Sequence, residues 1–451
     1  MFDKILVANR GEIALRVVRT CRELGIRTVV VHSSDDRESA AVTAADEAIH
    51  IGPAAARRSY LNMAAVLEAG VRAGADAVHP GYGFLSEDPD FAEAAEEAGM
   101  TFIGPPPGVL ERLGRKSEAR SLMADAGLPV LPGGIGSQDT LEAARRAAAD
   151  AGFPLIVKAV AGGGGRGTRV VHHPGDLAAA YAATRRDARA LFGDDRVYVE
   201  RYVTGARHVE VQVLCDRYRN ALHLGERDCS VQRRNQKLIE ETPAPRLPGE
   251  LLDAMRGSAV RGALAADYVG AGTFEFLVDR HGEFHFMEVN SRLQVEHPVT
   301  EMATGLDLVR EQIRIAAGEP LGLRQQDVRP RGVAIECRIN AEDPERDFAP
   351  SPGLLTEFRP PGGPFVRVDT HATAGMGISP AYDSLVAKVI VWAPDRSGAI
   401  ARMRRALAEL RVGGPSIRTT SDFLVRVLEH PSFVAAEHDT SIVAEMRRAG
   451  S

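Results

Sequence analysis

Short apolar strands alternate with amphipathic helices over the first quarter of the chain, and this alternation limits the folds open to it. Residues 4–8 form an apolar run, and residues 12–24 place apolar side chains at helical spacing before Gly25, a residue that favours the end of a helix. Further strands are expected at 28–32, 48–51, 77–79 and 101–103, and helices at 61–73 and 91–98. This order indicates a parallel, doubly wound sheet, which binds ligands at the carboxyl ends of its strands.

A run of polar residues follows a predicted strand late in the chain. Residues 288–297 contain seven polar or charged side chains, and the alternation before them places Glu288 and Asn290 on one face of the strand. Carboxylate and amide oxygens suit Mg²⁺. Arg292 and Glu296 then add a fixed cation and a candidate base. Metal ligands, cation and base together are typical of phosphoryl transfer, and a strand made polar only for solubility would lack this cluster.

A hairpin brings a second carboxylate to this strand. Residues 272–278 and 283–290 read as strands around the turn at 279–282. Glu275 can therefore face the same side as Glu288, which gives two carboxylates for one or two Mg²⁺ ions.

A run of glycines at 162–165 lies between two predicted strands, at 155–160 and 169–171. It reads either as an ordinary flexible loop or as a lid whose N–H groups cover nucleotide phosphates, with Lys158 and Lys116 adding positive charge. The run is not a Walker loop, because GxxxxGK[ST] is absent. Together with the carboxylates it completes the parts of an Mg–ATP site.

Three other features are ambiguous from spacing alone. Residues 226–237 read either as a solvated basic loop or as a group of side chains that holds an anion. Arg338 is a lone cation in an apolar strand, so it is either paired in the core or directed at an anionic intermediate. His208 is more commonly a structural histidine, and is retained as a site-lining residue.

Composition excludes several classes of protein. The 451 residues suffice for roughly two to three domains, and 44% hydrophobic with 26% charged residues is ordinary for a globular protein. A net charge of −6 argues against a nucleic-acid or anionic-membrane surface, and no apolar run reaches membrane length. The four cysteines lie far apart, which favours reduced thiols and a cytoplasmic location.

These motifs resemble those of biotin carboxylase, an ATP-grasp ligase, and the similarity runs from Ile5 to about Glu445. The markers are residues 8–14, 79–86, the glycine lid, 227–230 and 288–297. The resemblance implies an α/β and α+β ATP-grasp fold with a doubly wound N-terminal domain, a small lid and a larger mixed C-terminal part. The expected domains are 1–114 (N-terminal), 115–203 (ATP-grasp region with the lid), 204–330 (catalytic, with the metal site) and 331–451 (C-terminal).

The resemblance also implies a role for individual residues. It assigns the ATP phosphates and adenine to Lys116, Lys158, Gly163, Gly164, Gly165, Gly167, Glu200, Arg201, Val203, His208, Gln232 and Asn235. It assigns Mg²⁺ or Mn²⁺ to Glu275, Glu288 and Asn290, and bicarbonate to Lys237, Arg292, Gln294 and the Val295 backbone. Glu296 would be the base, Arg338 would stabilise the biotin enolate, and Tyr82 and Asp383 would bound the biotin entrance.

The sequence departs from many relatives at three positions in the nucleotide pocket. Asn235 replaces a histidine, Arg201 a lysine and Thr168 a methionine, so a shifted ATP affinity is expected. None of these changes removes a metal ligand or the proposed base.

The implied activity is ATP- and bicarbonate-dependent carboxylation of biotin on a biotin carboxyl carrier protein, the first half-reaction of an acetyl-CoA or acyl-CoA carboxylase in fatty-acid synthesis. The chain resembles the free-standing subunit type, which works with separate carboxyltransferase subunits. A homodimer is expected through positions matching Arg16, Arg19, Glu23 and Arg367. Three alternatives remain: a two-subunit pyruvate carboxylase, another ATP-grasp ligase such as a carbamoyl-phosphate or purine-pathway enzyme, and a non-catalytic nucleotide-binding regulator.

Overall fold

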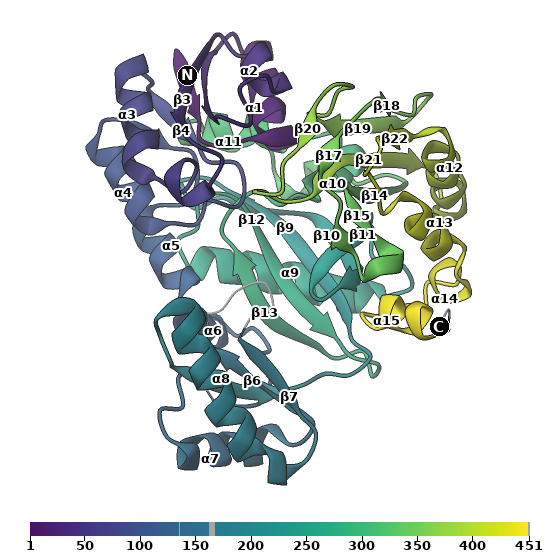
Figure 1. The fold of residues 1–451 in the computed structure, drawn as a ribbon. Helices are drawn as coiled ribbons and strands as arrows, with labels where there is room; N and C mark the ends of the chain where they lie inside the picture. The colour runs from purple at the N-terminus through teal and green to yellow at the C-terminus, as the bar shows by residue number, and fades with distance from the viewer. Residues whose placement is uncertain (135, 162–166, 450–451) are drawn as a thin grey trace.

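A computed structural model describes the whole chain except residues 135, 162–166 and 450–451. The lid glycines Gly163, Gly164 and Gly165 therefore lie outside the described residues. Figure 1 shows the N-terminal region at the top, a small lobe at the bottom and the C-terminal region along the right side, around long central strands. Within the described residues, no helix is both long and apolar enough to span a membrane.

The N-terminal region contains a parallel five-stranded sheet in the order β3-β2-β1-β4-β5. Its strands are β1 (Lys4–Val7), β2 (Arg27–Ser33), β3 (Glu47–Gly52), β4 (Ala77–His79) and β5 (Thr101–Phe102). The helices are α1 (Gly11–Glu23), α2 (Ala40–Ala44), α3 (Met63–Ala73), α4 (Pro89–Glu97) and α5 (Pro107–Gly114). The doubly wound sheet is thus confirmed, although α2 and α5 were not predicted. The turns after the neighbouring strands β1 and β4 lie at the carboxyl edge, where such sheets bind ligands.

The small lobe is built on an antiparallel sheet in the order β7-β6-β8, and two helices accompany it. Its elements are α7 (Leu141–Ala151), β6 (Leu155–Ala159), β7 (Thr168–Val171), α8 (Leu177–Phe192) and β8 (Val197–Arg201). The helix α7 was missed by the sequence reading, although Thr140 accepts a capping hydrogen bond from the Ala143 N–H group and the buried alanines recur at helical spacing. The preceding helix α6 (Lys116–Asp125) packs instead against α5 and the large sheet.

The largest element is an antiparallel eight-stranded sheet in the order β13-β12-β9-β10-β11-β14-β21-β19. Its strands are β9 (Arg207–Cys215), β10 (Ala221–Arg233), β11 (Gln236–Thr242), β12 (Gly270–Val278), β13 (Phe284–Asn290), β14 (Val333–Asn340), β19 (Val366–Thr370) and β21 (Leu385–Ala393). The sheet is continuous across residue 330, where a domain boundary was expected. The division into four domains stays a prediction.

Helices pack on both faces of this sheet, and the polar side chains of β14 lie on one of these faces. Helix α9 (Gly249–Ala265) packs on β9 and β10, α11 (Leu308–Ala316) on β12, and α12 (Arg396–Glu409) on β14 and β21. Helix α10 (His297–Thr304) also packs on β14 and β21, where Val299 meets Ala334 and Ile390. The residues that alternate with Ala334 on β14, Glu336 and Arg338, therefore face the same side as α10.

The C-terminal part adds three short strand pairs and three more helices. These are β15 (Glu342–Asp343) with β16 (Ala349–Pro350), β17 (Gly353–Leu354) with β20 (Gly377–Ile378), β18 (Glu357–Arg359) with β22 (Arg411–Gly413), α13 (Ser421–Glu429), α14 (Pro431–Val434) and α15 (Ile442–Ala449). The strands β17 and β18 lie close in sequence but are separate and pair with different partners.

Candidate active site

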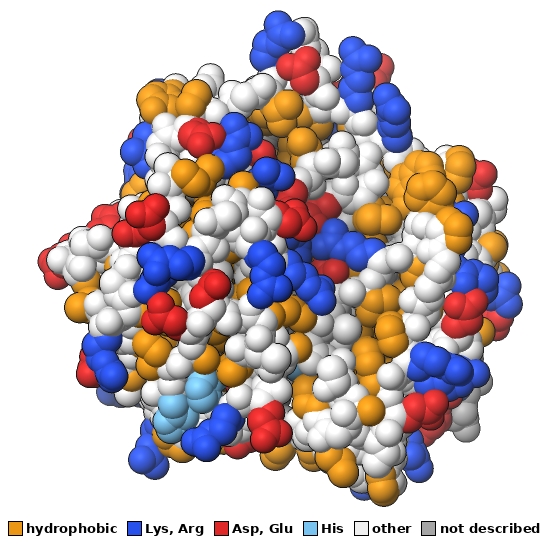
Figure 2. Space-filling model, turned by 90° about the horizontal axis from the view of Figure 1, so that it is seen from above, with side chains coloured by type: hydrophobic (Ala, Val, Ile, Leu, Met, Phe, Trp, Pro, Cys, Tyr) orange, Lys and Arg blue, Asp and Glu red, His pale blue; other side chains and the backbone are white. Residues whose placement is uncertain are grey.

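A cavity of about 910 Å³ opens between the N-terminal sheet, the small lobe and the large sheet. Among the described residues of the predicted set, all but Gly167 line this cavity. Gly167 instead lies immediately before β7, and its carbonyl accepts a hydrogen bond from the Ala159 N–H group. On the face shown in Figure 2, acidic and basic side chains are interspersed rather than gathered into a large area of one sign.

The predicted metal carboxylates lie side by side on the β12–β13 hairpin. Glu275 and Glu288 are register partners, and the Asn290 amide donates to Glu275 Oε1 at 2.8 Å. The expectation that these side chains share one face is therefore confirmed. The Lys116 ammonium, 2.9 Å from Glu288 Oε2, is the main reason that the Glu288 pKa falls to about 2. Burial raises the pKa of Glu275, but Lys237 and His208 outweigh it and lower that pKa to about 2 as well.

These two carboxylates fit a magnesium site. Both are ionised at neutral pH, and hard anionic oxygens are the ligands that Mg²⁺ or Mn²⁺ prefers. Lysine ammonium groups contact one oxygen of each carboxylate, so the site already attracts cations.

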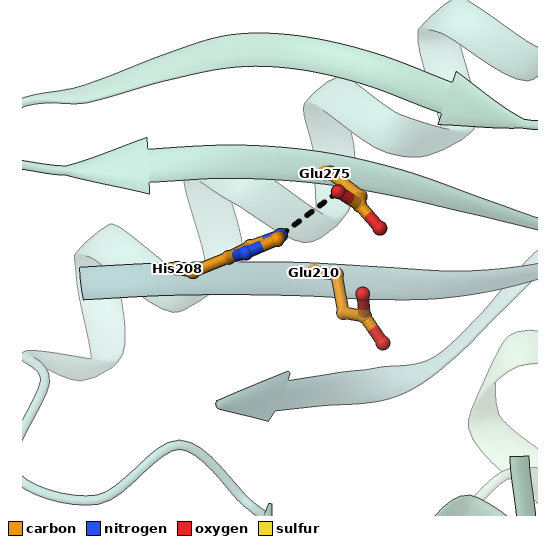
Figure 3. A group of neighbouring side chains, drawn as sticks. All are labelled: His208, Glu210 and Glu275. Carbon is orange, nitrogen blue, oxygen red and sulfur yellow. Dashed lines mark ion pairs between the residues drawn. The ribbon is translucent and has the colours of Figure 1, made fainter. Parts of the chain in front are cut away.

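Figure 3 shows a neighbouring group made by His208, Glu210 and Glu275, with the imidazole directed at Glu275. His208 Nε2 lies 2.9 Å from Glu275 Oε2, and Gln232 Nε2 lies 3.2 Å from His208 Nδ1. Burial opposes a charge on His208, but the Glu275 carboxylate prevails and raises the pKa of the imidazole. The ligand atoms of the three residues lie close enough for a metal, yet the Lys237 ammonium already contacts Glu210 and Glu275.

Lys237 is the central cation of the site. Its ammonium lies 2.5 Å from Glu210, 2.8 Å from Glu275 and 2.6 Å from Glu296. Burial disfavours the charged ammonium, but three carboxylates more than compensate and raise the pKa of Lys237 well above its ordinary value. The Lys237 ammonium therefore contacts both the predicted metal ligand Glu275 and the predicted base Glu296.

The predicted base Glu296 immediately precedes α10 and is fully buried. Its Oε1 lies 2.6 Å from Lys237, and its Oε2 lies 2.9 Å from Arg338 Nη2. Burial raises the pKa of Glu296, but these cations outweigh it and lower that pKa. The carboxylate is thus unprotonated and able to accept a proton. Arg338 is both paired and aimed into the cavity, since it also binds Glu240 on β11.

Arg292 is held by a residue that sequence reasoning missed. Glu87, in the loop after β4, accepts from Arg292 Nε at 2.9 Å and from the Ser291 backbone at 2.9 Å. The remaining guanidinium nitrogens donate to Asn290 Oδ1 at 3.0 Å and Gln294 Oε1 at 2.9 Å. The N-terminal region therefore fixes the polar loop that follows β13.

The small lobe supplies Lys158, one of the two lysines predicted to bind phosphate. Lys158 forms an ion pair with Glu200, which also accepts from Arg120 at 3.0 Å. Arg201 donates through Nε to the Ala151 carbonyl at 2.8 Å. This hydrogen bond holds the Arg201 side chain against helix α7 of the small lobe.

The segment 226–237 was ambiguous from sequence, and the solvated-loop interpretation is wrong. It belongs to β10 and β11, which join in a tight turn where Asn235 has a φ of +65°. Arg227 is fully buried, while Gln232, Asn235 and Lys237 line the cavity.

Tyr82, which also lines the cavity, donates to Glu12, and the Lys388 ammonium lies 2.8 Å from the same Glu12 oxygen. Lys388 also donates to the Val295 carbonyl at 2.9 Å and is 0% exposed. Asp383 lines the cavity nearby. Neither Glu12 nor Lys388 was predicted. A lone lysine in the apolar run 385–393 could have identified Lys388, as it did Lys158.

A doubly wound N-terminal sheet, a small antiparallel lobe and a large antiparallel sheet with paired carboxylates on its β12–β13 hairpin are the parts of an ATP-grasp ligase. Family models match at residues 1–110 (biotin carboxylase, N-terminal domain), 115–324 (carbamoyl-phosphate synthase L chain, ATP binding domain) and 336–445 (biotin carboxylase C-terminal domain). The chain is 51% identical over 447 residues to the biotin carboxylase of Nostoc sp., covering 99% of this chain and 100% of that protein. The chain belongs to the biotin carboxylase family.

Two further relatives bear on function. The biotin carboxylase domain dimer of the 2-oxoglutarate carboxylase of Hydrogenobacter thermophilus, solved with MgADP, ADP and bicarbonate, has a TM-score of 0.96. It is 44% identical, with 100% of this chain and 99% of that chain covered. A pyruvate carboxylase subunit from Methanothermobacter thermautotrophicus is 48% identical over 448 residues, which cover 99% of this chain and 91% of that protein.

Proposed function

We propose that this protein uses ATP and bicarbonate to carboxylate biotin held on a biotin carboxyl carrier protein. The main support is the unprotonated Glu296 carboxylate, held between Lys237 and Arg338 in the same cavity as the paired carboxylates. The Hydrogenobacter relative, which binds MgADP and bicarbonate, adds support from outside this chain.

ATP would lie between the small lobe and the large sheet. Lys116 and Lys158 would bind its phosphates once their present carboxylate partners yield to the nucleotide. Glu275, Glu288 and Asn290 would hold Mg²⁺ or Mn²⁺, which offsets the negative charge of the phosphate oxygens. Residues proposed to line the nucleotide pocket are Glu200, Arg201, Val203, His208, Gln232 and Asn235.

Bicarbonate would bind beside Glu296. Arg292, Gln294, the Val295 backbone and Lys237 would hold it, and Glu296 would accept its proton as a bicarbonate oxygen attacks the γ-phosphorus. The bond from the γ-phosphorus to ADP breaks, and carboxyphosphate forms. The buried position of Glu296 keeps this carboxylate from bulk water until the substrate arrives.

Carboxyphosphate then breaks down to CO₂ and phosphate, and the phosphate removes the N1′ proton of biotin. Arg338 would stabilise the resulting enolate, whose N1′ attacks CO₂ to give carboxybiotin. Tyr82 and Asp383, which line the cavity, would bound the entrance for biotin.

The final acceptor would be an acyl-CoA, most simply acetyl-CoA in fatty-acid synthesis, through separate carboxyltransferase subunits. The Methanothermobacter relative supports a second candidate, a two-subunit pyruvate carboxylase. A homodimer is also proposed, because the Hydrogenobacter relative is a dimer. Arg16 and Arg367, two of the residues expected at the dimer interface, both form ion pairs with Glu301 of the same chain.

ADP release from Mg–ATP, measured without and with bicarbonate and free biotin, tests the proposed function. The expected result is ADP release that requires bicarbonate and increases with biotin. ATP binding without a response to either substrate would refute biotin carboxylation and favour a silent regulator or another ATP-grasp substrate.

Replacing Glu87 with alanine tests how the polar loop is positioned. The variant Glu87→Ala loses the contacts to Ser291 and Arg292, so the KM for bicarbonate is expected to rise about tenfold. The KM for ATP should stay within about twofold, because Glu87 does not line the cavity. An unchanged KM for bicarbonate would show that Arg292 is placed without Glu87.

A further inference from the structure

Two glutamates that the proposed chemistry does not use lie directly opposite one another behind Arg338. Glu240 on β11 and Glu336 on β14 are register partners, and both are 0% exposed. The Cβ atoms of opposing residues in an antiparallel pair lie about 5 Å apart. Two carboxyl groups therefore share one buried site next to the arginine assigned to the biotin enolate.

Among the described residues, only one of the four carboxylate oxygens of this pair has a hydrogen-bond partner. Glu240 Oε1 accepts from Arg338 Nε at 2.6 Å and contacts Arg338 Nη2 at 2.5 Å. Glu240 Oε2 and both oxygens of Glu336 have no hydrogen-bond partner within the part of the chain that the structure describes. Buried acceptors without donors are costly. One proton on Glu336 would supply the missing donor for Glu240 Oε2.

The charges around the pair agree with one bound proton. Burial raises the pKa of Glu336 well above its ordinary value, and the charge of Glu240 raises it further. Burial raises the pKa of Glu240 less, to about 7, because Arg338 opposes it. Two like charges at this separation do not both ionise readily. Above about pH 7, the expected state is an anionic Glu240 beside a protonated Glu336.

The titratable and charged groups that act on the pair come from several neighbouring elements. They are Lys237 on β11, Cys229 on β10, Cys337 and Arg338 on β14, Lys388 on β21 and Glu296 immediately before α10. Lys388 is the cation that would favour an ionised Glu336. Its ammonium is instead hydrogen-bonded to Glu12 and to the Val295 carbonyl.

We propose that Glu336 is a positioning residue that stays protonated and donates a hydrogen bond to Glu240, so that Glu240 stays anionic and holds the Arg338 guanidinium. This inference rests on the proposed function, in which Arg338 meets the biotin enolate. When Glu296 accepts the proton of bicarbonate, it no longer attracts Arg338 as an anion. Glu240 then remains as the charged partner that keeps the guanidinium in place.

The test compares Glu336→Gln with Glu336→Met in the full chain, by measuring kcat for biotin-dependent ADP release against pH. Wild-type kcat is expected to fall as the pH drops through about 7, because Glu240 becomes protonated and loosens Arg338. Glutamine keeps an N–H donor, so Glu336→Gln should keep kcat within about twofold of wild type. Its kcat should also fall over the same acidic pH range, which is the acid limb of the pH profile. Methionine has no donor, so Glu336→Met should move the acid limb up by about one pH unit and lower kcat at pH 7 about fivefold.

Glu241→Gln is the matched control. Glu241 is the next residue on β11, and its side chain binds Arg396 instead of Arg338. This variant loses one carboxylate–arginine pair but should leave the acid limb unmoved. Equal losses in the glutamine and methionine variants, or an unmoved limb in Glu336→Met, would overturn the inference while wild-type activity still supported the proposed function. Wild-type protein without biotin-dependent ADP release would refute the proposed function instead.

An infrared measurement tests the same proton without any turnover. The difference spectrum of wild type minus Glu336→Gln at neutral pH should contain the carbonyl band of one protonated carboxyl group. An absent band would overturn the inference, including in the event that Glu336→Met fails to fold.

Discussion

The variant Glu296→Gln is expected to bind ATP normally but to lose about 10²-fold or more in bicarbonate-dependent turnover. Glutamine is nearly isosteric, and its single carbonyl oxygen can still accept a hydrogen bond from either Lys237 or Arg338, which bind separate oxygens of Glu296. It cannot take the proton of bicarbonate. Steady-state ADP release together with ATP binding by calorimetry would separate the chemical step from nucleotide affinity.

A suitable control for Glu296→Gln is Glu319→Gln. Glu319 pairs with Arg314 and does not line the cavity, so its loss of charge should leave turnover unchanged. Wild-type rates in Glu296→Gln would remove Glu296 from the proposed mechanism.

The variant Arg227→Met is expected to destabilise the protein by about 3–5 kcal/mol. Arg227 is 0% exposed, and its guanidinium binds Glu210 at 2.6 Å, Gln212 at 2.8 Å, Thr300 at 2.9 Å and Thr273 at 3.1 Å. Its removal leaves these buried groups without their donor and leaves Lys237 as the remaining cation at Glu210. Urea unfolding followed by circular dichroism would measure the loss.

The comparison for Arg227→Met is Arg404→Met. Arg404 pairs with Glu429 on the surface, and exposed ion pairs contribute little to stability. The urea midpoint of Arg404→Met should lie close to that of wild type. If the midpoint of Arg227→Met were equally close, the buried network would be shown to relax around the missing charge.

Much of the fold was predictable because it depends on local patterns. Apolar runs of three to five residues separated by amphipathic helices sufficed for the parallel sheet of β1 to β5. The period of two placed Glu288 and Asn290 on one face, and the turn at 279–282 placed Glu275 opposite Glu288. The resemblance to biotin carboxylase, carried by motifs spread along the chain, was confirmed by the family models.

Features that depend on distant segments were missed. Residues 226–237 were ambiguous because a polar strand buried between two other strands has the composition of a loop. The partners Glu87, Glu240 and Lys388 were also missed. Each is an ordinary charged residue within its own segment.

The sequence by itself therefore determined the class of fold, the family and the residue types from which the site is built. Only the tertiary structure decided which charges meet: Glu87 reaches Arg292 across 205 residues, and Arg338 reaches Glu240 across 98. Local periodicity reports which face a side chain occupies, because it depends on neighbouring backbone angles. The pairing of buried charges depends on how whole strands are ordered in the sheet, and no local pattern carries that information.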